Sequence, residues 1–154
     1  MLRAILQAEF AALSELERLL ILEFSALKAR HLEELENLIA AKQSCVEQCT
    51  RHFQERCAHL VSHGFEIGHA GTDSYIDSTP AGRRLALRSL WGDLRELGAR
   101  TRYRNEINGA IMAASRSHTE RALAVLQGRD AHVSLYGQGA QSTIGSPSLP
   151  LARV

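Results

Sequence analysis

The first 63 residues contain neither glycine nor proline, and this absence constrains the fold more than any other feature of the sequence. Glycine first occurs at Gly64 and proline first occurs at Pro80. Because both residues interrupt helices, so long a stretch without them favours continuous helix. Leucine, phenylalanine and cysteine recur within it at intervals of three, four and seven residues, so they share one helical face. The pattern predicts one long helix from about residue 2 to about residue 62, and it leaves a break near the middle of this helix open.

Glycines and small polar residues dominate the next segment, and a second helical pattern follows it. Residues 63–79 therefore read as a connector, and the pair Thr79-Pro80 is a typical helix start. A seam of leucines and small polar residues then predicts a helix over about 80–127, which Gly128 ends. Residues 128–154 are rich in Gly, Ser, Gln and Pro without any period, which predicts a flexible C-terminal tail. We expect one helical domain over residues 1–127 and a mobile tail over 128–154.

Composition supports an all-α fold. Leucine and alanine together number 43, whereas valine, isoleucine and threonine together number 19, a balance that disfavours a large sheet. Two consecutive long helices most simply form an antiparallel helical hairpin or bundle, with the start of the first helix beside the end of the second. The first helix then carries more apolar surface than the second can cover. The connector or the tail, a second copy in a homodimer, or a bound partner must cover the rest.

The sequence contains no candidate for membrane insertion or secretion. The longest apolar run near the N-terminus is Leu19 to Leu22, far short of the roughly 20 residues that a span requires. Glu9, Glu15 and Glu17 are incompatible with a secretory signal. The three cysteines are odd in number and crowded together, which favours a reducing compartment. We therefore expect a cytoplasmic protein.

The cysteines lie among histidines in a cluster of soft ligands formed by Cys45, Cys49, His52, Cys57, His59 and His63. Such a cluster could bind zinc through pairs four residues apart. Ligands on one straight helix do not converge on a tetrahedral site, however, and buried cysteine behaves as a small hydrophobic residue. The sequence also lacks a nucleophile elbow, a phosphate-binding loop and a paired carboxylate site. We expect no metal, no cofactor and no enzymatic activity.

The second helix is basic, with nine arginines and four acidic residues between Arg83 and Leu126. Arg84, Arg88, Arg95 and Arg102 lie within one stripe, so a nucleic-acid groove is one interpretation. The alternative is a solvated face attracted to the acidic first helix. The net charge of the chain is only +1, which favours the alternative, and we expect no nucleic-acid partner.

Two asparagines interrupt the apolar seam of the second helix, at Asn105 and Asn108, and Gly109 follows them. A buried asparagine can fix the register of packed helices. Gly109 costs about 1 kcal/mol relative to alanine within a helix. A close approach of another backbone would explain that cost.

Several stretches resemble the FlgN family of flagellar export chaperones. They are Leu27 to Leu35 with Ala41 to Gln43, Leu90-Trp91 leading through Tyr103 to Gly109, and Thr119 to Leu126 followed by Leu135 to Gly139. The Asn-x-x-Asn-Gly and Leu-Tyr-Gly-x-Gly patterns are the most specific of them. The likeness covers most of residues 1–139.

The resemblance implies a cytoplasmic chaperone without enzymatic activity. It would bind the helical ends of hook-associated flagellar proteins, keep them unassembled, and deliver them to the export gate and ATPase complex of the type III export apparatus. A structural coiled-coil adaptor and a basic helical RNA-binding protein are the alternatives. The partner-binding residues that we expect lie on the later part of the second helix and in the tail: Asn105, Asn108, Gly109, Ile111, Met112, Ser115, Thr119, Leu123, Leu126 and Tyr136. By the same resemblance, Tyr136 would contact the export gate.

Overall fold

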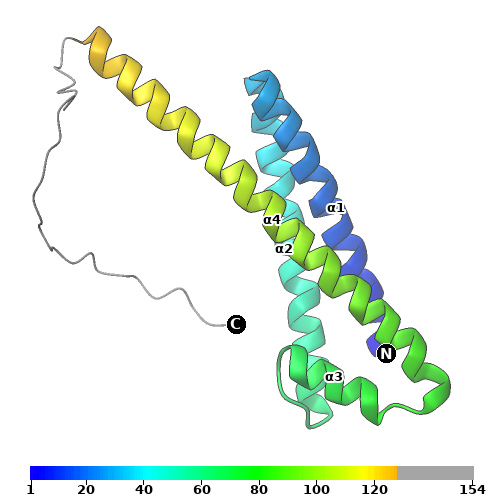
Figure 1. Ribbon diagram of the computed structural model, residues 1–154. Helices are drawn as coiled ribbons and strands as arrows, with labels where there is room; N and C mark the ends of the chain where they lie inside the picture. The colour runs from blue at the N-terminus through cyan, green and yellow to red at the C-terminus, as the bar shows by residue number, and fades with distance from the viewer. Residues whose placement is uncertain (128–154) are drawn as a thin grey trace, which may run out of the picture. The chain divides into compact units, whose positions relative to one another are not determined.

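The computed structural model describes residues 1–127, which form four helices and no strand. These are α1 (Leu2–Ala29), α2 (Leu32–Ser62), α3 (His69–Ser78) and α4 (Ala81–Leu126), all labelled in Figure 1. The chain divides into two compact units at Ala114, and α4 runs from the first unit into the second. The predicted all-α class is confirmed, whereas the predicted tail lies outside the described residues.

The single helix predicted over residues 2–62 is wrong, because the chain reverses at Arg30. This residue adopts a left-handed conformation with φ 58° and ψ 36°. The backbone N–H of His31 then donates to the carbonyl of Ala26 at 3.1 Å, which closes the end of α1. These hydrogen bonds offset the energetic cost of the left-handed conformation, which is unfavourable for arginine. The turn also lets the apolar faces on both sides of it pack together, which one straight helix could not do.

Helices α1 and α2 lie side by side in antiparallel orientation (Figure 1). Lys42 reaches Glu23 near the turn, at 2.5 Å between Nζ and Oε1. Further along, the thiol of Cys45 donates to the carbonyl of Ala12 at 3.3 Å. These contacts place the start of α1 beside the end of α2.

The segment predicted as a connector contains a ten-residue helix, α3, which packs against α2. Gly64 and Gly68 have φ values of +78° and +108°, a conformation that side chains other than glycine rarely adopt. A Cβ atom on Gly71 would lie 1.7 Å from the carbonyl oxygen of Glu66, so this position also requires glycine. Helix α3 has only ten residues, and Ile76 is its one buried member of the core. The sequence of this helix therefore shows no clear apolar periodicity.

The main core lies where α1, α3 and α4 meet. Its buried members are Leu2, Leu6, Ile76, Leu87, Trp91 and Leu94. Helix α4 therefore starts beside the start of α1 and runs parallel to it, so the predicted pairing of the start of the first helix with the end of the second is wrong. The physical reason is the extra reversal at Arg30, which makes α2, rather than α4, the antiparallel neighbour of α1.

This arrangement decides what covers α1. Leu2, Leu6, Leu19 and Leu20 are all buried by the chain's own residues. Of the alternatives left open by the sequence, internal coverage therefore holds for these four leucines, whereas Ile21 and Phe24 of the same helix stay exposed. No helix of the described part is long and apolar enough to cross a membrane.

We predict a clear difference between two leucines of α4. Leu94 is 4% exposed and lies in the core, whereas Leu85 is 79% exposed. Leu94→Ala should lower the free energy of unfolding by about 2–5 kcal/mol, because it removes buried methyl groups and leaves a cavity. Leu85→Ala, the matched control, should change it by about 0.5 kcal/mol or less. Urea denaturation followed by far-UV circular dichroism measures both, and equal effects would contradict this core.

Candidate partner-binding site

A buried polar junction joins three helices of the first unit. The side-chain amide of Asn108 on α4 donates to the carbonyl of Leu20 at 2.8 Å and to Glu23 Oε2 at 2.7 Å. The other oxygen of Glu23 accepts from Lys42 on α2. Glu23 and Asn108 are both buried, and no buried side-chain polar atom in the described residues lacks a partner. The junction therefore satisfies its own polar groups and specifies one register for α1, α2 and α4.

Asn105 and Gly109, the neighbours of Asn108 in the sequence motif, are exposed. The inward line of α4 runs through Leu97, Thr101 and Asn108, so Asn105 lies to one side of it. The prediction that Asn105 belongs to the seam is wrong. A Cβ atom on Gly109 would meet nothing within 4 Å, so the predicted close backbone approach there is also wrong.

Exposed apolar side chains remain on α1 and α2 near the junction. Phe24 lies on the same face of α1 as Leu20, which contacts α4, yet Phe24 is 40% exposed. Ile21 on the same helix and Ile39 on α2 are similarly exposed. On α4 itself, Ile111 and Met112 are half-buried. The first unit thus leaves apolar surface uncovered beyond its core.

The part of α4 in the second unit, described by itself, exposes almost every side chain. Leu123 is 49% exposed, Val125 65% and Leu126 82%. The predicted site residues Ser115 and Thr119 are exposed as well. These residues share a helical segment rather than a pocket. Tyr136, the remaining predicted site residue, lies outside the described residues.

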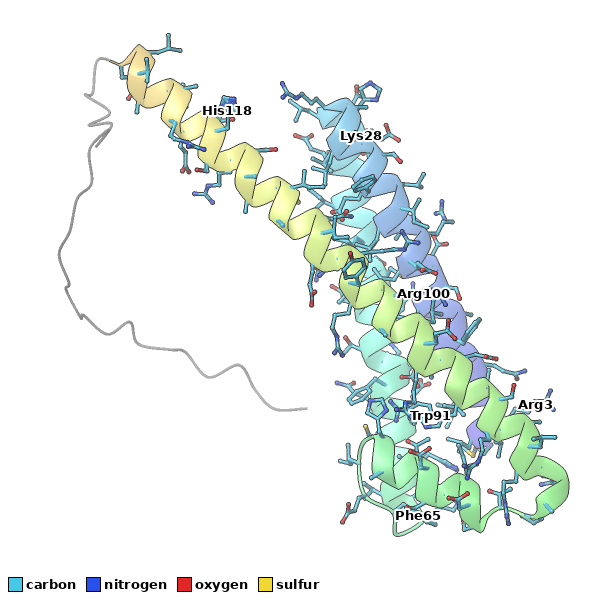
Figure 2. All side chains as sticks on the ribbon, in the orientation of Figure 1. Arg3, Lys28, Phe65, Trp91, Arg100 and His118 are labelled. Carbon is cyan, nitrogen blue, oxygen red and sulfur yellow. The ribbon has the colours of Figure 1, made fainter. Side chains whose placement is uncertain are left out.

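Ion pairs use part of the basic face of α4. Glu17 of α1 accepts hydrogen bonds from Arg100 and Arg104, each at 3.2 Å, and the bond from Arg100 is the main reason that the pKa of Glu17 lies below its ordinary value. Figure 2 labels Arg100 on the face of α4 beside α1. Arg88, a member of the predicted basic stripe, pairs with Asp77. The contacts of Arg100 and Arg104 agree with a basic helix attracted to the acidic first helix, whereas Arg88 pairs with α3.

The cysteines pack as apolar residues. Burial raises the pKa of the Cys45 and Cys57 thiols, and it raises that of Cys49 to about 11. At neutral pH all three are therefore protonated and weakly nucleophilic. Within residues 1–127, no group of three or more His, Cys, Asp or Glu side chains is arranged to hold a metal ion.

Sequence reasoning missed Arg56, which is buried in α2. Its guanidinium donates to both carboxylate oxygens of Glu9, at 2.8 and 3.2 Å, and to Thr72 Oγ1 at 3.0 Å. It also lies 4.8 Å from the centre of the Trp91 ring, the only tryptophan of the chain. Its position could have indicated burial, because Arg56 lies on the same helical face as Phe53 and Leu60. A charged residue on an apolar face is buried only where oppositely charged or polar partners surround it, and the sequence did not identify these partners.

These features define a small helical protein with a packed, internally paired core and an exposed apolar helix end. Comparisons with known proteins identify its family. The family model described as FlgN protein matches residues 1–143. The chain belongs to the FlgN family.

A solved structure is also similar. It is the crystal structure of a flagella synthesis protein FlgN from Pseudomonas aeruginosa, with a TM-score of 0.65 and 27% sequence identity over 81% of this chain and 94% of that chain. No curated protein matches. The resemblance drawn from the sequence is thereby confirmed at the level of the family.

We predict that the buried junction stabilises the bundle through Asn108. Asn108→Ala leaves Glu23 without one of its two side-chain donors, so the free energy of unfolding should fall by about 1–3 kcal/mol. Asn105→Ala, three residues away on the exposed face, is the matched control and should change it by about 0.5 kcal/mol or less. Chemical denaturation of both variants measures the difference. A neutral effect at Asn108 would mean that the junction contributes nothing to stability.

Proposed function

We propose that this protein is a cytoplasmic flagellar export chaperone. In this proposal it binds the helical ends of hook-associated proteins, prevents their premature assembly, and delivers them to the type III export apparatus. Membership of the FlgN family and the structural likeness to a flagella synthesis protein support a flagellar role. The observation that carries the binding step is the exposed apolar end of α4. The proposal includes no catalytic step and no cofactor.

The end of α4 has the properties of a surface that binds another helix. Leu123, Val125 and Leu126 expose large apolar side chains within four residues. Contiguous exposed apolar surface on a soluble protein usually marks an interaction site. An amphipathic client helix docks by packing its apolar face against such residues, and small neighbours such as Ser115 and Thr119 allow close approach. A client helix would thus cover the apolar residues of α4. Its own apolar face would be covered in turn, which would prevent the client from assembling.

We assign the client-binding role to the half-buried and exposed residues of the predicted set. These are Asn105, Gly109, Ile111, Met112, Ser115, Thr119, Leu123 and Leu126. Asn108 acts differently, because both of its hydrogen bonds lie inside the bundle. We retain residues 1–127 as the helical domain and residues 128–154 as a tail that takes part in delivery.

The alternative functions rest on weaker observations. A coiled-coil adaptor or homodimer would cover the same apolar residues with a second copy, and it would bind no client. An RNA-binding role needs free arginines along the basic stripe, but Arg88 is paired with Asp77 and Arg84 donates to the carbonyl of Thr79.

We predict that charges at the end of α4 weaken client binding. The double variant Leu123→Glu with Leu126→Glu should reduce affinity for the C-terminal segment of a hook-associated protein by about tenfold or more, because it places carboxylates against apolar side chains. Fluorescence anisotropy with a labelled segment measures the affinity. The fold should survive, since both positions are exposed.

Leu85→Glu is the matched control for this experiment. It introduces the same change at an exposed leucine near the opposite end of α4. Its affinity should equal that of the unchanged protein. Equal weakening by both variants, or none by the double variant, would contradict binding at the end of α4. Light scattering on the free protein tests the homodimer.

We also predict that Tyr136 separates delivery from client binding. Tyr136→Ala should leave the affinity for the client segment unchanged, while secretion of the client falls several-fold. The reason is the role that family resemblance assigns to this tyrosine, contact with the export gate. Measuring client affinity and secreted client side by side distinguishes the two steps. Parallel loss of both would refute a separate docking role.

A further inference from the structure

A pocket of about 350 Å³ lies where the first turns of α1 and α4 meet α3. Its apolar wall includes Leu2 and Leu87, which belong to the core, and the ring of Tyr75. The Tyr75 hydroxyl forms a hydrogen bond with His59 Nε2 at 3.1 Å. Tyr75 therefore contributes its aromatic ring to the pocket, rather than a free hydroxyl. The volume falls at the lower end of the range for ligand-binding pockets, enough for one or two side chains.

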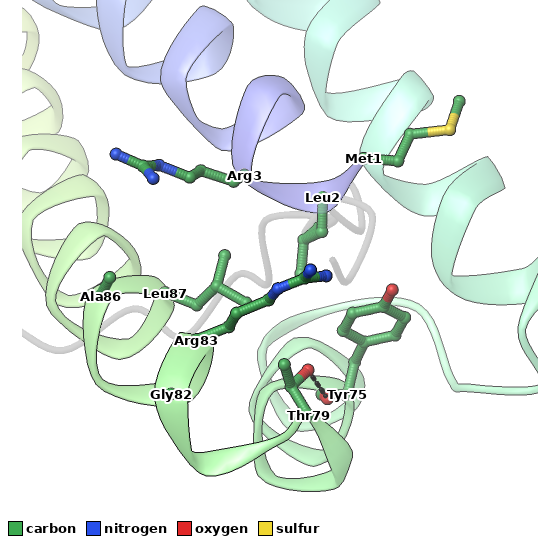
Figure 3. Close-up of a pocket in the computed structure, with 9 residues that line it drawn as sticks. All are labelled: Met1, Leu2, Arg3, Tyr75, Thr79, Gly82, Arg83, Ala86 and Leu87. Atoms are coloured by element: carbon green, nitrogen blue, oxygen red, sulfur yellow. Dashed lines mark hydrogen bonds between the residues drawn. The ribbon is translucent and has the colours of Figure 1, made fainter.

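Two arginines, Arg3 from α1 and Arg83 from α4, also line this pocket, and no acidic residue does. Figure 3 shows Arg83 reaching from α4 toward Leu2 and Tyr75. Within residues 1–127, neither arginine forms an ion pair with an acidic side chain. Other arginines on the same helix, Arg88, Arg100 and Arg104, do have acidic partners. The pocket therefore concentrates positive charge that the described chain does not neutralise.

The helix ends reinforce this charge. The first turns of α1 and α4 contain no acidic residue, so the positive ends of both helix dipoles are uncompensated. Free backbone N–H groups at helix starts and arginine side chains both favour anions. Arginine in particular matches a carboxylate through two parallel hydrogen bonds. An apolar wall beside such donors favours a ligand in which a carboxylate lies next to an apolar group.

We propose that this pocket binds a carboxylate that neighbours an apolar side chain, as an acidic segment of a partner polypeptide presents it. The apolar side chain packs on Leu2 and Leu87, and the carboxylate accepts hydrogen bonds from Arg83. Arg3, whose side chain extends away from Arg83 in Figure 3, adds positive charge beside the pocket. None of the residues that line this pocket is among those assigned to client binding, so the inference is independent of the proposed function.

The test is an NMR titration of the full chain with the blocked tetrapeptide acetyl-LELD-amide. We expect saturable shifts of the backbone amides of Thr79, Gly82 and Ala86, which line the pocket. The neutral analogue acetyl-LQLN-amide should bind at least about tenfold more weakly, and higher salt should weaken the charged peptide. Equal shifts from the neutral analogue, or from inorganic phosphate at the same concentration, would overturn the assignment.

Two pairs of variants localise the binding. Arg3→Gln with Arg83→Gln should weaken the charged peptide by about tenfold or more, since hydrogen bonds to charged groups dominate such contacts. Arg95→Gln with Arg102→Gln removes two exposed arginines of α4 outside the pocket and should have no effect. An equal loss from both pairs would reveal only general charge attraction and would overturn the proposal.

A second design blocks the pocket without changing charge. A Cβ atom on Gly82 meets nothing within 4 Å, so Gly82→Leu can be accommodated and fills the pocket that this glycine lines. Gly92 is equally unobstructed on the same helix but lies outside the pocket, which makes Gly92→Leu the matched control. Loss of peptide shifts in the first variant alone supports the site, and unchanged binding in the first variant rules it out.

Discussion

The reversal at Arg30 is the constraint on which the rest of the first unit depends. Helix α1 carries apolar residues around more than one stripe and therefore needs neighbours on two sides. The left-handed turn brings α2 back along one side, and α4 then packs along the other. Without the turn, the first 62 residues would form a rod with its leucines exposed. With it, the buried leucines of α1 become the centre of a bundle.

Polar groups inside this bundle specify the register of its helices more than they contribute to its free energy of folding. Glu23 and Arg56 are both buried and charged, and each is fully engaged by partners from other helices. Burying such pairs rarely stabilises a fold more than apolar packing would, but a shifted register would leave each charge unpaired, at a high cost. The two sets of contacts lie at different levels of the bundle, and together they favour one alignment of the helices.

The surface that remains after packing is what the proposed chaperone role uses. The core buries Leu2, Leu6, Leu19 and Leu20 of α1, whereas the end of α4 keeps Leu123, Val125 and Leu126 exposed. The same helix carries Arg83 at its beginning, which has no acidic partner among residues 1–127. The surface outside the core therefore includes both exposed apolar side chains and a pocket lined by arginines.

The sequence alone determined the helical class, the C-terminal end of α2, the bounds of α4 to within a residue and the membership of the FlgN family, because periodicity, helix breakers and motifs are local signals. It did not determine the turn at Arg30, since no glycine or proline marks it. It also could not distinguish the buried Asn108 from the exposed Asn105, which differ only in the direction of the neighbouring helices. Only the tertiary structure decided these points. The energy of a left-handed arginine or a buried amide depends on partners that lie far away in the sequence.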